Sequence, residues 1–303
     1  MRVWQGLWLG LLVAGGLAGC DRPIAEAGSP SEVSASERPS TVSDVQYRVE
    51  TLPTADVHWV MVPIRTFEVV PAIADGLQPL SQFAQQPGTV AAINAGFFDP
   101  VNGLTTSYGV QNGQLVADPR QNDRLMQNPN LAPYLSKILN RSEFRRYRCG
   151  ELGRELNHYA IARHADAMPP GCTLQDAIGG GPRLLPEQTL EAEGFADPAT
   201  GRDALGSTQP NARSAVGILP NGDIVLVLVA QRPDAPTTSG LSLEALAEFL
   251  QSLGMVDALN LDGGSSASLY VGGNTVFGRV DAQDNPVQRP VKSVLRVRPI
   301  SHH

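Results

Sequence analysis

The sequence predicts a mixed α/β fold of the α+β type, in which helices flank a central, largely antiparallel sheet within a single globular domain. The chain of 303 residues contains 30 glycines and 24 prolines but only 6% aromatic residues, a composition that favours short strands joined by many turns. Strand-like runs alternate with hairpin turns, and one clear amphipathic helix stands late in the chain. A chain of this length can bury a substantial core.

The first 19 residues predict a lipoprotein signal peptide. Arg2 supplies a positive charge, and the apolar run at 7–17 is shorter than the roughly 20 residues that span a bilayer. The letters LAGC at 17–20 resemble a bacterial lipobox, whose cysteine becomes the first mature residue and carries lipid such as palmitate. An ordinary signal peptide or an anchor helix is the alternative. We therefore expect an exported protein that Cys20 anchors to a bacterial membrane, on its periplasmic side or at the cell surface.

Residues 20–44 predict the lipidated cysteine followed by a disordered tether, because they are rich in Ser, Pro, Ala and Glu and lack aromatic residues. The folded domain should then cover residues 45–300. Its first expected strands follow one another closely, at 45–52, 57–64, 67–73 and 89–94.

Two hairpins and one helix are the clearest elements of this domain. Asn112-Gly113 separates two extended runs as a type I′ turn does, and residues 213–230 contain a second strand pair around a Pro-Asn-Gly turn. The run at 224–229 is apolar without alternation, which predicts a strand buried on both faces. Residues 242–254 predict a helix with serine as its N-cap and glycine after its last turn.

Residues 120–156 form a polar, arginine-rich segment with weak helical character near 134–139. The segment is either a lid near the site or a surface insertion without a role. Its basic cluster, Arg145, Arg146 and Arg148, is expected on a solvated face, where such clusters usually lie.

Charge and cysteine content limit the partners and the compartment. The net charge of −7 does not favour nucleic acid, whose binding surfaces are usually basic. Besides Cys20 the chain has Cys149 and Cys172, and an even pair in an exported protein predicts one disulfide. Two unpaired thiols are the alternative.

Four segments contain the candidate functional residues, and each is an apolar strand that runs into glycine and a polar residue. They are AAINAGFFDP (91–100), DAIGGGPRLL (176–185), NARSAVGI (211–218) and LNLDGGSSASL (259–269). Loops at strand ends commonly present functional groups, glycine lets a ligand approach the backbone, and successive N–H groups can bind anions. Each segment alone fits an ordinary turn, whereas four of them in one chain indicate a site.

INAGFFD, IGGGPRL, RSAVG and LNLDGGSS, in this order, resemble the motifs of the phosphodiester glycosidase family, over roughly residues 45–300. The resemblance implies a hydrolase that cleaves sugar-1-phosphodiester linkages in cell-surface or extracellular glycans, and bacterial relatives are often labelled exopolysaccharide-related. Ser265 departs from the pattern, because the family commonly has a third glycine there. The alternative is a surface lipoprotein that binds polysaccharide without cleaving it.

The implied chemistry assigns a role to each candidate residue. The leaving group is a phosphate monoester with a second pKa of about 6, so it can depart without a strong general acid. The resemblance makes Arg213 the clamp on the phosphate and makes Asp262 and Asp99 the catalytic carboxylates. The predicted substrate-binding residues are Asn94, Phe97, Phe98, Gly179, Gly180, Gly181, Arg183, Gly263, Gly264 and Ser265.

Structural roles compete with these assignments. Asp262 also fits a cap of the loop that follows it, Asp99 fits a turn before Pro100, and Arg213 fits a buried ion pair with one of these aspartates. No cofactor is expected, and the sequence leaves a divalent metal open. The expected partners are a glycan or sugar-phosphate substrate and, through the lipid anchor, a membrane.

Overall fold

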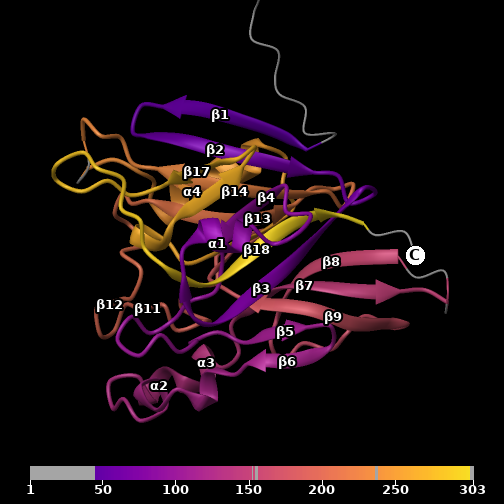
Figure 1. Cartoon of the computed structure of the whole chain (residues 1–303). Helices are drawn as coiled ribbons and strands as arrows, with labels where there is room; N and C mark the ends of the chain where they lie inside the picture. Colours follow the sequence, from indigo (N-terminus) through magenta and orange to yellow (C-terminus); the bar gives the residue numbers. More distant parts are fainter. Residues whose placement is uncertain (1–44, 152, 154–155, 236–237, 301–303) are drawn as a thin grey trace, which may run out of the picture. The chain divides into compact units, whose positions relative to one another are not determined.

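The computed structural model describes residues 45–151, 153, 156–235 and 238–300 (Figure 1). The predicted signal peptide, the lipidation site and the tether lie outside the described residues. Within these ranges the strands form mostly antiparallel sheets and the helices are few and short, which confirms the predicted fold class. None of the helices in the described ranges is long and apolar enough to cross a membrane.

The first sheet has the strand order β1-β2-β14-β13-β15-β10. Its strands are β1 (Gln46–Leu52), β2 (Ala55–Val62), β10 (Arg183–Leu185), β13 (Arg213–Ile218), β14 (Ile224–Ala230) and β15 (Asp257–Asn260). β14 is an interior strand and is buried at every position, as its unbroken apolar run predicts. β13 and β14 form the second predicted hairpin.

Helix α4 (Leu243–Ser252) connects β14 to β15 and packs on one face of the first sheet. Ser242 is its N-cap as predicted, because the hydroxyl accepts a hydrogen bond from the N–H of Ala245 at 3.1 Å. Gly254, which follows the helix, has a φ of +84°, the left-handed conformation that glycine adopts readily.

The second sheet has the strand order β17-β16-β4-β18-β3. Its strands are β3 (Phe67–Gln78), β4 (Ala91–Asn94), β16 (Ser268–Val271), β17 (Asn274–Phe277) and β18 (Val291–Pro299). Helix α1 (Leu80–Ala84) covers its outer face through Leu80 and Phe83. The main core lies between the inner faces of the first and second sheets, where residues of β13, β14 and β15 meet residues of β4, β16 and β18.

The third sheet has the strand order β6-β5-β9-β7-β8, and its labelled strands lie in the lower part of Figure 1. Its strands are β5 (Gly109–Gln111), β6 (Gln114–Ala117), β7 (Ser142–Cys149), β8 (Leu156–Arg163) and β9 (Cys172–Gly179). The remaining elements are η1 (Pro119–Gln121), α2 (Asp123–Met126), η2 (Ala132–Tyr134), α3 (Leu135–Ile138), β11 (Ala196–Asp197), β12 (Arg202–Asp203) and η3 (Gly264–Ser266).

Asn112 and Gly113 have φ values of 51° and 76°, which confirms the predicted hairpin turn. The segment 120–156 therefore supplies an interior strand, and the role of its helical first half as a lid stays a prediction.

Arg145 and Arg146 correct the expectation of a solvated basic face, because they are only 3% and 8% exposed. They are neighbours on an interior strand, so their side chains point to opposite faces of the sheet. Arg145 pairs with Glu143 at 2.8 Å, and Arg146 pairs with Asp176 and Glu68. These acids satisfy charges that would otherwise be costly to bury.

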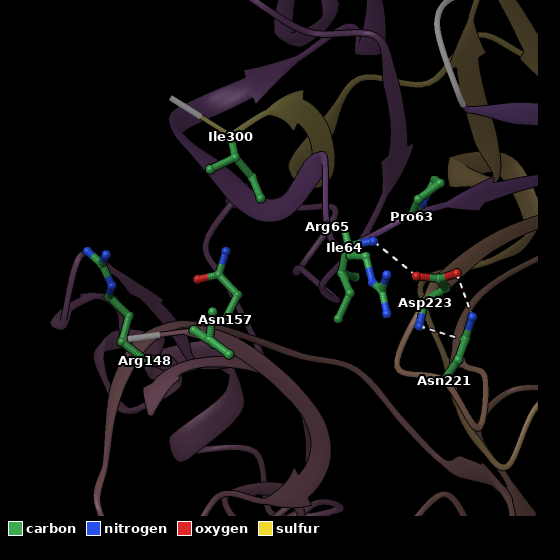
Figure 2. Close-up of a pocket in the computed structure, with 9 residues that line it drawn as sticks. Pro63, Ile64, Arg65, Arg148, Asn157, Asn221, Asp223 and Ile300 are labelled. Atoms are coloured by element: carbon green, nitrogen blue, oxygen red, sulfur yellow. Dashed lines mark hydrogen bonds between the residues drawn. The ribbon is translucent and has the colours of Figure 1, made fainter. Parts of the chain in front are cut away.

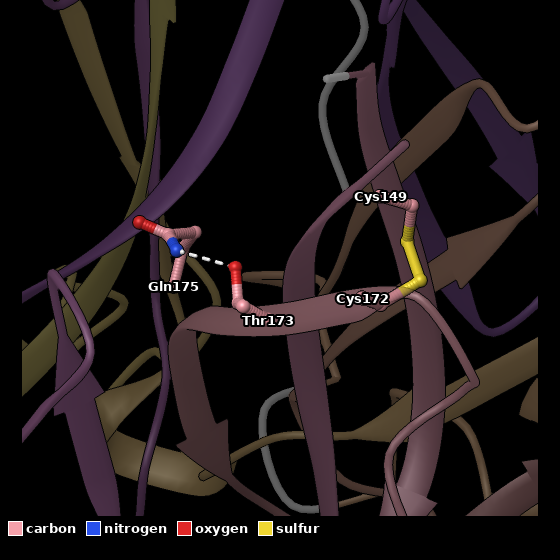
Figure 3. Close-up of a disulfide and its surroundings, with 4 residues drawn as sticks. All are labelled: Cys149, Cys172, Thr173 and Gln175. Atoms are coloured by element: carbon pink, nitrogen blue, oxygen red, sulfur yellow. Dashed lines mark hydrogen bonds between the residues drawn. A yellow bond between two sulfur atoms is a disulfide. The ribbon is translucent and has the colours of Figure 1, made fainter. Parts of the chain in front are cut away.

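The predicted disulfide is confirmed: Cys149 at the end of β7 bonds Cys172 at the start of β9 (Figure 3). The two cysteines are paired partners in the strand register, so the bond fixes the open end of this strand pair.

Loss of this disulfide should destabilise the domain. A crosslink over 23 residues stabilises by about 3 kcal/mol in the chain-entropy model. We expect the Cys149→Ala/Cys172→Ala variant to lose about 2–4 kcal/mol of unfolding free energy, measured by urea unfolding without reductant. Reductant should bring the wild type to the same level and leave the variant unchanged. A wild-type midpoint that does not move on reduction would contradict this prediction.

Candidate functional site

The ends of β4, β13 and β15 meet around the side chain of Asn94, which is fully buried. Its Oδ1 accepts hydrogen bonds from the Ser214 hydroxyl at 2.7 Å and from the N–H of Ser268 at 3.0 Å. Its Nδ2 donates to the carbonyl of Asp262. Asn94 therefore braces the two sheets and the Asp-Gly-Gly loop, and its predicted contact with substrate stays a prediction.

The Asp-Gly-Gly loop takes a path that requires its glycines. The N–H of Asp262 donates to the carbonyl of Ala95 at 2.8 Å, and a Cβ added to Gly263 would lie 3.0 Å from the carbonyl oxygen of Ala212. Gly264 has a φ of 58°, in the left-handed region that favours glycine. Ser265 has no positive φ, so serine fits where the family commonly has a third glycine.

Asp262 is a half-buried carboxylate with a perturbed pKa. Burial raises this pKa from 3.8 to about 6, against the opposing effects of Ser266, the positive charge of Arg289 and the N–H of Gly263. The Ser266 hydroxyl is close enough to lower the pKa but makes no well-formed hydrogen bond within the described residues. A carboxylate with this pKa can exchange a proton near neutral pH.

Arg289 is the cation that sequence reasoning missed. Its Nη1 donates to the Ser265 hydroxyl at 3.0 Å, and its guanidinium lies 4.8 Å from the centroid of the Phe98 ring. Its charge also lowers the pKa of Asp262. Arg289 lies in the irregular segment between β17 and β18, outside all four motifs, so no local pattern marks it.

A cavity of about 610 Å³ opens beside Ser265. Asn211, Gln231 and the exposed Arg279 also line it. Gln231 is only 8% exposed, and its Oε1 has no hydrogen-bond partner within the described residues. A buried polar atom without a partner is rare in folded proteins and suits a site that receives water or a ligand. In the described part of the chain, no group of three or more His, Cys, Asp or Glu residues is arranged to hold a metal ion.

Arg213 lies beneath the site and is 3% exposed. Its three guanidinium nitrogens donate to the carbonyls of Leu241, Leu205, Gly206 and Gln209 at 2.7–3.1 Å. Burial lowers its pKa to about 10. Its guanidinium therefore holds the 205–209 loop. The predicted phosphate clamp stays a prediction, and this geometry does not favour it.

The triglycine at 179–181 is closely packed, and its N–H groups already have partners. They donate to the carbonyls of Tyr108, Ser142 and Asn260. A Cβ on Gly180 would lie 2.7 Å from the Asn260 carbonyl oxygen, and one on Gly181 would lie within 2.7 Å of the Phe195 ring. The glycines therefore allow neighbouring segments to approach, and their predicted contact with phosphate or sugar stays a prediction.

Asp99 and Arg183 lie in local structures of their own. Asp99 accepts hydrogen bonds from the N–H of Val101 and from Arg124, each at 2.8 Å. These contacts outweigh the effect of burial and hold the pKa of Asp99 below its ordinary value. Asp99 thus has the geometry of the alternative, a turn residue. Arg183 pairs with Asp257 at 2.6 Å, and the predicted site roles of both residues remain predictions.

The two predicted aromatic residues have different surroundings. Phe98 is 8% exposed and supports Arg289. Phe97 is half-buried and packs on Phe195, with ring centroids 5.7 Å apart. Phe98 is thus the ring of this pair that contacts Arg289, the arginine whose charge lowers the pKa of Asp262.

A larger cavity, of about 760 Å³, lies at the turns that follow β2 and β13 and beside the β7–β8 hairpin (Figure 2). Arg65, Arg148, Asn157 and Asp223 line it, and Asp223 accepts a hydrogen bond from the N–H of Ile64 at 3.1 Å. It shares no residue with the four motifs, so the candidate site is assigned to the cavity beside Ser265.

Comparison with known proteins places the chain within a family of glycosidase-type hydrolases. The model of the phosphodiester glycosidase family matches residues 87–298, which is most of the chain. The chain therefore belongs to the phosphodiester glycosidase family. None of the curated proteins matches the sequence significantly.

Solved structures share this fold. A hypothetical protein from Synechocystis has a TM-score of 0.55 at 20% identity, over 84% of this chain and 62% of that one, so this chain spans about 62% of its length. The zebrafish N-acetylglucosamine-1-phosphodiester α-N-acetylglucosaminidase catalytic domain, auto-inhibited by its pro-peptide, has a TM-score of 0.60 at 20% identity, over 84% and 82% of the two chains. A Burkholderia pseudomallei protein described as exported has a TM-score of 0.56 at 16% identity, over 81% and 74%.

Replacing Arg213 should lower the free energy of unfolding and leave the KM for substrate nearly unchanged. Arg213→Lys keeps the charge, but one ammonium cannot reach the four carbonyls that the planar guanidinium holds. We expect a loss of about 2–4 kcal/mol in urea unfolding, with the KM for a sugar-1-phosphodiester within about twofold for the folded variant. Arg124→Lys, at an exposed arginine, is the matched control. Native stability with a KM raised about tenfold would instead establish Arg213 as a phosphate ligand.

Asp262→Asn should stabilise the protein at neutral and alkaline pH. Because the folded-state pKa of about 6 exceeds 3.8, ionising Asp262 costs the folded state free energy as pH rises through this window. For a half-buried side chain we expect a gain of about 1 kcal/mol at about pH 8 and almost none at about pH 4, measured by urea unfolding. Asp123→Asn, at an exposed carboxylate, is the control. A variant that is less stable than the wild type at about pH 8 would contradict this expectation.

Proposed function

We propose that this protein hydrolyses the bond between the anomeric carbon of a sugar and a phosphate oxygen, within a phosphodiester of a cell-surface or extracellular glycan. Family membership supports a glycosidase-type hydrolase. The observation that supports the finer proposal is the Asp-Gly-Gly loop, which joins Asp262, with a pKa of about 6, to Ser265 on the wall of an open cavity. Arg289 donates to Ser265, and its charge lowers the pKa of Asp262.

The phosphate side of the bond needs positive charge. As the bond between carbon and oxygen breaks, the phosphate leaves with the electron pair as a monoester, which is stable near neutral pH. Arg289 is held by Ser265 and Phe98 and has further N–H donors for phosphate oxygens. Arg279 adds a second guanidinium at the cavity wall. In this proposal these two arginines take the role that the sequence assigns to Arg213.

The sugar side of the bond needs a base and a placed water. Water attacks the anomeric carbon while the ionised Asp262 takes its proton, and Asp262 then releases that proton to solvent. A pKa near 6 leaves most of the carboxylate ionised at neutral pH and still basic enough to accept a proton. The bond from Asn94 to the carbonyl of Asp262 fixes the loop, so that the carboxylate is oriented before substrate binds.

The test of this proposal is sugar release from a panel of sugar-1-phosphodiesters, with and without chelator. We expect Asp262→Asn to lower kcat by about 10²–10⁴. The wild-type kcat/KM should fall below about pH 6, because protonated Asp262 cannot act as a base. Arg289→Gln should raise KM about tenfold or more, whereas Arg48→Gln, which removes an exposed arginine of β1, should not.

Two results would overturn the proposal. One is the absence of sugar release by the wild type from every member of the panel. The other is glycan binding that survives both Asp262→Asn and Arg289→Gln without any turnover, which would favour a polysaccharide-binding surface lipoprotein.

The proposal includes a location. The apolar run at 7–17 and the letters LAGC at 17–20 support export and lipid attachment at Cys20. Labelled palmitate should be incorporated into the wild type and not into Cys20→Ser, and that variant should leave the membrane fraction. Membrane retention and labelling of the Cys20→Ser variant would contradict the assignment.

A further inference from the structure

A separate cavity of about 340 Å³ lies where β3, β6 and β18 meet the segment around η1. Most of the polar groups on its wall belong to six residues: Asp75, Gln111, Asp118, Gln121, Asn122 and Lys292. Its volume is at the small end of the range for ligand pockets. None of the predicted site residues lines it.

Lys292 is the buried charge in this cavity and one of the two lysines in the chain. It is 7% exposed, and its Nζ donates to the carbonyl of Asp75 at 2.7 Å. No ion pair to Lys292 is present within the described ranges, although the nearby charge of Asp75 opposes the lowering of its pKa by burial. An ammonium has three donors. Two therefore remain for a ligand in the cavity.

The opposite wall supplies fixed acceptors and donors. Asn122 is 1% exposed and is held by Asn102 at 3.0 Å. Asp118 accepts hydrogen bonds from the N–H and the guanidinium of Arg120, which keep the carboxylate ionised and oriented at the cavity wall. Gln111 is anchored through Nε2 to the carbonyl of Pro71, and its Oε1 has no hydrogen-bond partner within the described residues.

The charge balance of this cavity selects a neutral ligand. Lys292 faces Asp75, and the charge of Asp118 is offset by Arg120. A phosphate or a carboxylate would meet two acidic side chains, and a metal ion would meet the buried ammonium. Alternating carboxylates, amides and an ammonium suit vicinal hydroxyl groups, which both donate and accept hydrogen bonds.

We infer that this cavity is a second sugar-binding subsite, which takes one neutral monosaccharide unit through Lys292, Gln111 and the other amide side chains. The inference rests on the proposed function in one respect, namely that the bound unit belongs to the glycan being cleaved. A subsite of this kind lengthens the glycan that the protein recognises and adds affinity away from the bond that breaks.

The cavity is coupled to the Asp262 loop through consecutive contacts. Ser293, next to Lys292, accepts a hydrogen bond from the N–H of Gly96 through its hydroxyl and one from the N–H of Ala95 through its carbonyl, each at 3.0 Å. The carbonyl of Ala95 in turn accepts the N–H of Asp262 at 2.8 Å. A sugar bound by Lys292 is therefore linked, through Ser293 and Ala95, to the backbone of the candidate base Asp262.

The experiment measures binding of free neutral sugars by saturation-transfer difference NMR. The probes are glucose, mannose, galactose and N-acetylglucosamine at millimolar concentration, with inorganic phosphate as the charged probe. Lys292→Met keeps the length of the side chain and removes its donors. We expect at least one neutral sugar to bind the wild type and to bind Lys292→Met about tenfold more weakly, with Glu248→Gln, at an exposed residue of α4, unchanged. Gln121→Ala, at an exposed wall residue, serves as the second variant if Lys292→Met does not fold.

The outcomes separate this inference from the proposed function. Sugar binding that depends on Lys292 supports the subsite, even if no phosphodiester is cleaved. The subsite is overturned if no neutral sugar binds, if binding is equal in the wild type and the variants, or if inorganic phosphate binds in a Lys292-dependent manner. If cleavage is observed, Lys292→Met should raise KM for a longer glycan substrate and leave kcat and the KM of a single-sugar substrate within about twofold.

Discussion

The buried carboxamide of Asn94 decides where the two main sheets meet. Its three hydrogen bonds reach residues that lie 120, 168 and 174 positions further along the chain. An amide presents a donor and an acceptor side by side, so neither a carboxylate nor an apolar side chain can satisfy all three partners. Because an unsatisfied buried group costs about 1–3 kcal/mol, this side chain strongly selects one arrangement of the strand ends.

The properties of the candidate site follow from this arrangement. The Asp262 backbone is held through both its N–H and its carbonyl, so the loop has a fixed path and the half-buried carboxylate leaves it at a fixed point. Burial raises the pKa of Asp262 to about 6, so ionising this carboxylate near neutral pH costs the folded state free energy. The Asp-Gly-Gly loop adds little flexibility, because each glycine is required by a close backbone approach or by a positive φ.

Local patterns predicted the parts of this fold that depend on neighbours in sequence. The apolar run of β14, the Asn112-Gly113 turn and the Ser242 cap are each decided within a few residues. The position of Arg289 depends on the ring of Phe98 in the loop after β4. Arg146 is buried against Asp176 of another strand, and Arg145 against Glu143 of its own strand and carbonyls at and beyond the end of β8. The sequence motifs include Asn94 and Asp262, which the structure brings together, but they could not show which N–H groups and guanidinium donors were already paired.

The contacts of Arg213 affect which substitutions the 205–209 loop can accept. Its guanidinium donates hydrogen bonds to four main-chain carbonyls and, within the described residues, to no side chain. Every residue type supplies the same carbonyl, so these contacts place no demand on the side chains of Leu205 and Gln209, whereas Gly206 has a φ of 57° that favours glycine. That loop runs directly into Asn211 on the cavity wall. A point mutation at Leu205 or Gln209 can therefore change a side chain near the cavity while the carbonyl contacts of Arg213 hold the backbone in place.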